Sequence, residues 1–416
     1  MKGKNKVGTM LIGLCWLVYT CSYIGKVNYA ANINQVIDFY KVDHSSAGLV
    51  STCFFFAYGI GQIFNGLFCK KYNLKWMVCI SLILSGIANL VVGISNHFSL
   101  IKYVWLLNGF SMSILWPSLI LLLSECLPKK DMTQATLAMG TTVATGTFLA
   151  YGLSALLVKI NFKLVFTLAT AIFAVVAILW VSMYSGMVGK IRGNFIEEEI
   201  AVSQTQNSEN KQGFNKSILL LSVVVLGVFG VATNLVKDGL TTWVPSILKE
   251  QYHLDSSFSI ILTLLLPVVS IFGNAFAVKV HKKIPDYVMQ CAAVFLVVGV
   301  IMGGVIGCVS LAQFWLTLIA FAIVCFLASS CNTLITNIFP LFMKGKVNSG
   351  LMAGILNGCC YLGSTLASYG LGAIADNFGW ITVFWTLFFV CVGICVVTLI
   401  YVIIKKSLIG KSLNIE

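Results

Sequence analysis

The 416-residue sequence has little charge: Asp, Glu, Lys and Arg together make up 10% of it, against 58% hydrophobic residues. A soluble domain of this length would carry far more charge, because its surface has to be solvated. Instead, apolar runs of about twenty residues recur from Val7 onward, and each is long enough to cross a bilayer. The shortage of charge therefore excludes an ordinary soluble protein and predicts an integral membrane protein.

The sequence also lacks the residue groupings of common enzyme, metal and nucleotide sites. Its 14 cysteines include no Cys-x-x-Cys pair, so we interpret them as small apolar packing residues. No nucleophile–base pair and no phosphate-cradling glycine-rich loop is visible. We therefore predict no enzymatic activity, no metal and no cofactor, and no use of ATP. No role is assigned to the four histidines, His44, His97, His253 and His281.

Acidic residues are scarce relative to basic ones, which gives a formal net charge of +13. A nucleic-acid partner would need a basic face, but here the lysines lie in short loops between apolar runs and concentrate on one side of the predicted membrane. By the positive-inside rule this places both termini in the cytoplasm of a multi-pass protein of the cell membrane, and it argues against nucleic acid. The opposite loops hold only Lys41, Lys102, Lys159, Lys163 and Lys249.

Hydropathy predicts an all-α fold of twelve transmembrane helices in two six-helix bundles, 1–187 and 217–416. Between them, the polar stretch 188–216 has too little apolar content to bury a core, so we expect a cytoplasmic linker. The first run, although it follows three lysines, is long enough to be an uncleaved span. The predicted spans are 7–37, 45–69, 75–96, 99–126, 131–158 and 162–187, then 217–248, 257–280, 285–308, 311–338, 349–374 and 379–404.

The two predicted bundles show weak internal sequence repetition. Lys26 in the first span and Lys237 in the seventh have the same separation as Lys71 and Lys282, which follow the second and eighth spans. Weak repetition of this kind is typical of secondary transporters, whose substrate site lies near mid-membrane between the repeats.

Charged residues inside the predicted spans are few: Lys26, Lys237 and Asp238. A charge in hydrocarbon costs about 2.5–3.5 kcal/mol on insertion scales, so each needs a reason to be there. Two lysines that face one another repel, and an anion such as phosphate or a carboxylate would neutralise them. The alternative is that each lysine reaches outward to the lipid headgroups. Polar neighbours at helical spacing, including Tyr19 and Tyr23 before Lys26, favour the interior site.

The segment Tyr23-Ile24-Gly25-Lys26-Val27-Asn28-Tyr29-Ala30 resembles the first-helix motif of the organophosphate:phosphate antiporters, a branch of the major facilitator superfamily that includes bacterial glycerol-3-phosphate and hexose-phosphate transporters. The resemblance extends over nearly the whole chain. Further matching segments are Ala57-Tyr58-Gly59, Trp116-Pro117, Lys237-Asp238-Gly239, Trp243-Val244-Pro245, Tyr361-Leu362-Gly363 and Asp376-Asn377-Phe378-Gly379-Trp380.

The resemblance implies a monomeric carrier in which two basic residues, here Lys26 and Lys237, hold a phosphoryl group. It implies that Tyr19, Tyr23, Tyr58, Trp116 and Tyr361 line the same pocket. The sequence departs from the family pattern in that pocket: lysine replaces arginine at both basic positions, Gln62 stands where a lysine is usual, and Thr142 where a histidine is usual. Lysine binds phosphate as a point charge, whereas arginine binds it through two parallel hydrogen bonds, so the change indicates altered specificity. The alternative is a general drift from arginine to lysine, since the chain has one arginine, Arg192.

We therefore expect a secondary transporter of a small organic anion, a phosphate ester exchanged for inorganic phosphate, working by alternating access in the lipid bilayer. We expect the empty, doubly positive site to resist reorientation and so to enforce exchange. One alternative is a proton-coupled symporter or exporter that uses Asp238 as its protonatable group. Another is a transporter-like membrane sensor, which would bind without flux. The loop 66–75 has lost the acidic residue of the superfamily's loop motif at Lys70 or its neighbour, which puts the usual charge-paired gate in doubt.

Overall fold

The computed structural model describes residues 2–68, 71–195, 216–284, 286–342 and 349–413, and the regular elements in these ranges are all helices. The first helix set comprises α1 (Lys2–Ala31), α2 (Ile33–Tyr40), α3 (His44–Phe68), α4 (Leu74–Ile94), α5 (Phe98–Met112), α6 (Leu115–Cys126), α7 (Lys129–Leu157) and α8 (Lys163–Phe195). The second helix set comprises α9 (Lys216–Tyr252), α10 (Ser256–Thr263), α11 (Leu265–Lys283), α12 (Tyr287–Ser310), α13 (Phe314–Thr333), a π-helical turn (Leu334–Ile338), α14 (Phe339–Phe342) and α15 (Ser349–Leu413).

The described residues contain ten stretches that are long and apolar enough to cross a membrane. One of them, Met352–Leu408, is 57 residues long and holds two spans, because α15 turns at Gly379, whose φ of +77° is a left-handed value that favours glycine. Helix α7 is 29 residues long and less apolar, and it supplies a further span that packs against α1. Together these give twelve, which confirms the predicted fold class.

Prolines explain why several spans are interrupted. A proline has no N–H to donate to the carbonyl four residues earlier, and its ring crowds that turn. The predicted span 99–126 is broken between α5 and α6, just before Pro117, and the predicted span 257–280 is broken at Leu264, just before Pro267. Pro340 follows the π-helical turn, and Pro245 lies inside α9. The first predicted span, 7–37, is also shorter than expected, because α1 ends at Ala31 and α2 is a separate helix.

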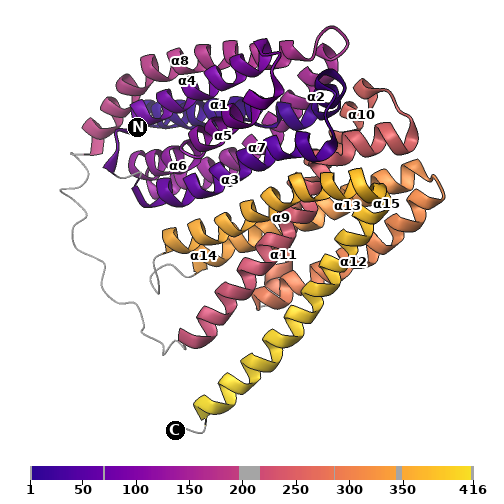
Figure 1. The fold of residues 1–416 in the computed structure, drawn as a ribbon. Helices are drawn as coiled ribbons and strands as arrows, with labels where there is room; N and C mark the ends of the chain where they lie inside the picture. The colour runs from indigo at the N-terminus through magenta and orange to yellow at the C-terminus, as the bar shows by residue number, and fades with distance from the viewer. Residues whose placement is uncertain (1, 69–70, 196–215, 285, 343–348, 414–416) are drawn as a thin grey trace.

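The two helix sets meet along a long seam, and both chain ends lie at one end of the molecule (Figure 1). We call this the terminal end, and the opposite end, which carries α2, α10 and residues 41–43, the distal end. Across the seam, the first span of α15 packs along α3 and also against α9 of its own set. Most of the predicted linker, 188–216, lies outside the described residues; its first part, to Phe195, continues α8. Cys69 and Lys70 of the loop motif are likewise outside the described residues.

Candidate functional site

Lys26 lies on α1 in the middle of the bundle, and its ammonium group is surrounded by aromatic rings. Its Nζ is 4.0 Å from the ring centroid of Tyr58 on α3, 4.9 Å from that of Tyr23, and 5.4 Å from that of Tyr361 on α15. The faces of these rings carry partial negative charge and attract a cation. Because the rings come from both helix sets, Lys26 lies at the seam inside the protein and does not reach to the lipid headgroups.

Lys237 lies on α9 next to the only acidic residue of the predicted pocket. Its Nζ is 3.5 Å from Asp238 Oδ1, and the two side chains retain 22% and 16% of their exposure. Ser364 of α15 donates a hydrogen bond to the other oxygen of Asp238. A polar chain supports this serine, since Asn234 donates to Ser364 Oγ at 3.2 Å and Asn332 of α13 donates to Asn234 at 3.3 Å. Asp238 is thus fixed as the partner of Lys237.

The structure brings the two lysines to one shared environment. Asp238 and Tyr23 each interact electrostatically with both Lys26 and Lys237. The three charged groups sum to +1, so the expected doubly positive site is wrong in its charge. The sequence analysis named Asp238 as a possible proton-coupling group. In the structure its carboxylate lies beside Lys237 as an internal counter-ion.

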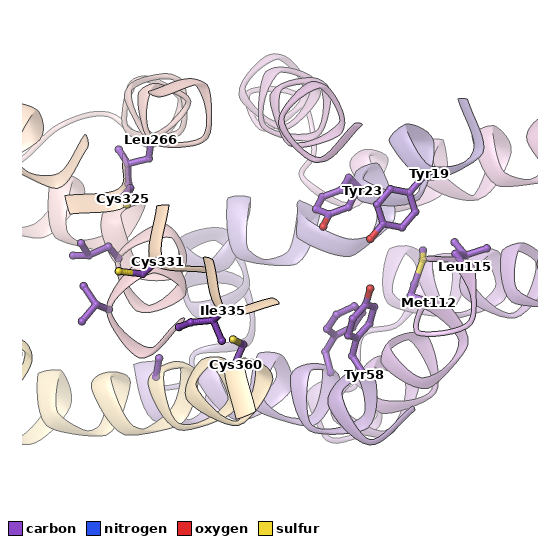
Figure 2. Packing of buried hydrophobic residues seen from close by; sticks show 14 of the residues in the cluster. Tyr19, Tyr23, Tyr58, Met112, Leu115, Leu266, Cys325, Cys331, Ile335 and Cys360 are labelled. Atoms are coloured by element: carbon purple, nitrogen blue, oxygen red, sulfur yellow. The ribbon is translucent and has the colours of Figure 1, made fainter. Parts of the chain in front are cut away.

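The predicted aromatic residues divide between two neighbouring groups. Tyr19 packs at a tilt against Trp116 of α6 with ring centroids 4.8 Å apart and meets Tyr23 edge-on at 5.6 Å. Tyr58 and Tyr361 pack against each other across the seam, 4.6 Å apart. Figure 2 shows the hydroxyl groups of Tyr19 and Tyr23 pointing toward that of Tyr58. Hydroxyls can both donate and accept, so this arrangement can bind the oxygens of a polar solute.

Gln62 and Thr142, the other two predicted pocket residues, are buried and bonded elsewhere. Pro117 leaves the carbonyl of Ser113 without its helical donor, and Gln62 Nε2 fills that role at 3.2 Å. Thr142 Oγ1 donates to the Met139 carbonyl of its own helix. Each side chain thus bonds a backbone carbonyl, and their predicted place in the pocket stays a prediction.

Tyr151 of α7 lies beside the site and was not selected by the sequence argument. Its hydroxyl donates across the seam to the Thr241 carbonyl at 3.1 Å, the carbonyl that Pro245 deprives of a helical donor. Tyr151 also interacts electrostatically with Asp238. The two features that could have identified it are a tyrosine in a transmembrane helix and a proline four residues after an unpaired carbonyl.

The distal end is fastened by a polar cluster around His44, the first residue of α3. Its Nδ1 is 2.7 Å from Asp376 Oδ1 on α15, and its Nε2 is 2.7 Å from Glu250 Oε1 on α9. The backbone N–H groups of His44 and Ser45 donate to the same Asp376 carboxylate, as expected for an anion at a helix N-terminus. Trp380 Nε1 donates to Glu250 at 2.8 Å. The sequence argument, which gave this histidine no role, was wrong.

Other hydrogen bonds across the seam lie in the same distal region. Asn34 accepts from Ser246, Asp38 pairs with Lys249 at 2.6 Å, and Ser257 donates to the Ala155 carbonyl. Among the described residues, the pairs near the terminal end stay within one helix set: Lys75 with Ser185 in the first, and Asp286 with Lys405 in the second. Although burial raises the pKa of Asp286, hydrogen bonding and charge from Lys405 outweigh it and lower that pKa. The seam is thus closed at the distal end.

Comparison with known families gives a match over most of the chain. Residues 15–303 match the family described as Major Facilitator Superfamily. Among solved structures, the fold is similar to that of a bacterial homolog of the human lysosomal transporter Spinster, crystallised in an inward-facing and occupied conformation. The TM-score is 0.72 at 13% identity, over 96% of this chain and 97% of that one.

Three relatives have names that refer to sensing or phosphorylated sugars. The chain is 27% identical over 95 residues to the membrane sensor protein UhpC of Escherichia coli, which is 23% of this chain and 22% of that protein. It is 24% identical over 116 residues to a probable hexose phosphate transport protein of Chlamydia trachomatis, 28% of this chain and 25% of that protein. These matches therefore span about a quarter of each relative. Sugar phosphate exchanger 3 of Bos taurus is 20% identical over 401 residues, 86% of this chain and 80% of that protein.

Proposed function

Because this chain belongs to the Major Facilitator Superfamily, we propose that it carries a small organic anion across the membrane, a phosphate ester exchanged for inorganic phosphate. The chlamydial and bovine relatives are named for transport or exchange rather than for an enzymatic activity. The observation that carries the proposal is the meeting of Lys26 and Lys237, one from each helix set, in a shared environment with Tyr23 and Asp238.

Charge and hydrogen bonding favour a phosphoryl group as the solute's anchor. Lys26 is surrounded by aromatic rings and, among the described residues, no carboxylate pairs with it directly, so its ammonium group can bind an anion. A phosphoryl group carries up to two negative charges and several acceptor oxygens, enough to bridge two ammonium groups. The names of the chlamydial and bovine relatives refer to hexose phosphate and sugar phosphate, which supports the same chemistry.

The transport cycle we propose is alternating access between two bundles, 1–187 and 217–416, joined by the linker 188–216 and acting as a monomer. The lysine-rich loops lie on the side of the terminal end, which we assign to the cytoplasm of the cell membrane. Because the distal seam is closed, we assign this conformation to the cytoplasm-facing half of the cycle. Lys26, whose charge Asp238 does not fully offset, disfavours reorientation without substrate and so promotes exchange.

A proton-coupled carrier is the second candidate, and the geometry of Asp238 is its basis. This carboxyl group lies beside Lys237 and keeps 16% of its exposure, so a proton could reach it during the cycle. A pH gradient would then drive uptake with no need for internal phosphate. A membrane sensor, suggested by the name of the bacterial relative, would bind the solute without flux.

The test is counterflow in proteoliposomes loaded with inorganic phosphate, against a panel of sugar phosphates, glycerol phosphate and carboxylates. We expect exchange of at least one phosphate ester and a loss of about 10- to 100-fold in Lys26→Ala and in Lys237→Ala, since a hydrogen bond to a charged group is worth about 1.5–3 kcal/mol. Lys159→Ala, an exposed lysine in a distal loop, serves as the control and should exchange normally. Normal exchange by both central variants would contradict the two-lysine site.

A further inference from the structure

The contacts of His44 require a proton that its neutral ring does not have. Both ring nitrogens lie 2.7 Å from carboxylate oxygens. A neutral imidazole has one N–H donor and one acceptor nitrogen, whereas an ionised carboxylate only accepts. Both contacts are therefore hydrogen bonds only if the cluster holds one extra proton.

The surrounding donors indicate where that proton is. Asp376 accepts from the backbone N–H groups of His44 and Ser45, and Glu250 accepts from Trp380 Nε1. These donors favour the ionised carboxylates, so the proton is on the His44 ring. Two neighbouring charges have partners of their own: Lys249 pairs with Asp38, although it also interacts electrostatically with Glu250, and Asp43 accepts from the Ser46 N–H. The side-chain and backbone hydrogen bonds of Ser46 also lower the pKa of Asp43, which stays ionised and does not supply the proton.

The cluster exists only while the distal seam is closed, because its members come from α3, α9 and α15. A Cβ built on Gly48 of α3 would lie 2.1 Å from the Ser368 carbonyl oxygen, so glycine is needed for α3 and α15 to approach this closely. The rings of Trp243 and Trp380 flank His44 at 5.6 and 5.4 Å and cover it. When the seam opens, the ring separates from at least one carboxylate and meets water.

We propose that His44, Glu250 and Asp376 form a proton-binding site that couples closure of the distal seam to the pH on that side of the membrane. The closed state holds one proton more than the open state at neutral or alkaline pH. Acid on the distal side therefore favours closure, and alkaline pH favours opening. Because a histidine in water titrates near pH ~6.5, the effect falls between about pH 5.5 and about pH 8.

Hydrogen–deuterium exchange on the full chain in lipid nanodiscs, without substrate, tests this directly. Peptides that contain 44–52 and 372–380 should exchange about tenfold faster at about pH 8 than at about pH 5.5, after correction for the intrinsic rates. His44→Gln should abolish this pH dependence, because glutamine does not titrate. His97→Gln, an exposed histidine at the same end of the molecule, should behave as the unmodified protein does.

Glu250→Gln gives a second, opposite prediction. A neutral His44 ring can then donate from Nδ1 to Asp376 and accept at Nε2 from the glutamine amide, so both contacts survive without the extra proton. The distal peptides should stay protected at both pH values. The proposal is overturned if the unmodified protein shows no pH dependence, or if either His44→Gln or Glu250→Gln retains it unchanged. Since no substrate is present, the outcome does not depend on what the protein carries.

Discussion

The two central lysines have different surroundings. Lys26 faces aromatic rings from both helix sets, at 4.0 Å from Tyr58 and 5.4 Å from Tyr361, while Lys237 faces the carboxylate of Asp238 at 3.5 Å. Aromatic rings do not neutralise an ammonium group, whereas the carboxylate of Asp238 offsets part of the positive charge of Lys237. From this difference we propose that Lys26 is the principal anchor for an anion and that the Lys237–Asp238 pair adjusts the charge of the site.

Asp238→Asn removes the carboxylate from this comparison and should have the largest effect among the substitutions at Asp238, Tyr361 and Gln62. The site charge changes from +1 to +2, so we expect phosphate to bind about tenfold more tightly, allowing for solvent screening of these partly exposed groups. Exchange should then be limited by slow release. The measurement is phosphate affinity and exchange rate in the same preparation. Asp131→Asn at the start of α7 makes the same change of net charge on another element and should leave the affinity unchanged.

The ring of Tyr361 tests the aromatic surroundings of Lys26. Tyr361→Leu removes one ring from the ammonium group and should weaken phosphate binding about fivefold, since a cation–π contact is worth about 0.5–2 kcal/mol. Tyr361→Phe keeps the ring and is the matched control. Equal affinities in the two variants would mean that the ring does not position Lys26.

Substitution of Gln62 should give the smallest effect, and it distinguishes a role in stability from a role in phosphate binding. Gln62→Ala leaves the Ser113 carbonyl unpaired and should lower the free energy of unfolding by about 1 kcal/mol, with phosphate affinity unchanged. Pro117→Ala restores an N–H that can reach that carbonyl, so Gln62→Ala should cost less in the Pro117→Ala background. Reduced phosphate affinity in Gln62→Ala would instead return this residue to the pocket.

Much of the fold could be predicted from the sequence, because the bilayer imposes long apolar runs that are legible one by one. The breaks at Ser113 and Leu264 were missed, although Pro117 and Pro267 signal them. In the site, the scarcity of charge inside the predicted spans selected the two lysines, and the resemblance added most of the tyrosines around them. His44, Glu250 and Asp376 were not grouped, since they lie far apart in the chain and meet only when α3, α9 and α15 pack. Gln62 is a motif position whose side chain also bonds the backbone, because Pro117 leaves the Ser113 carbonyl without a helical donor.

The account's central claim is that one phosphoryl group bridges Lys26 and Lys237, with Lys26 as the stronger anchor. Binding of radiolabelled phosphate to the purified protein tests it most directly, in Lys26→Met, Lys237→Met and the control Lys159→Met. We predict that both central variants lose at least about tenfold in affinity, with the larger loss in Lys26→Met, because a charged hydrogen bond is worth about 1.5–3 kcal/mol. Affinity equal to that of the unmodified protein in either central variant would contradict the claim.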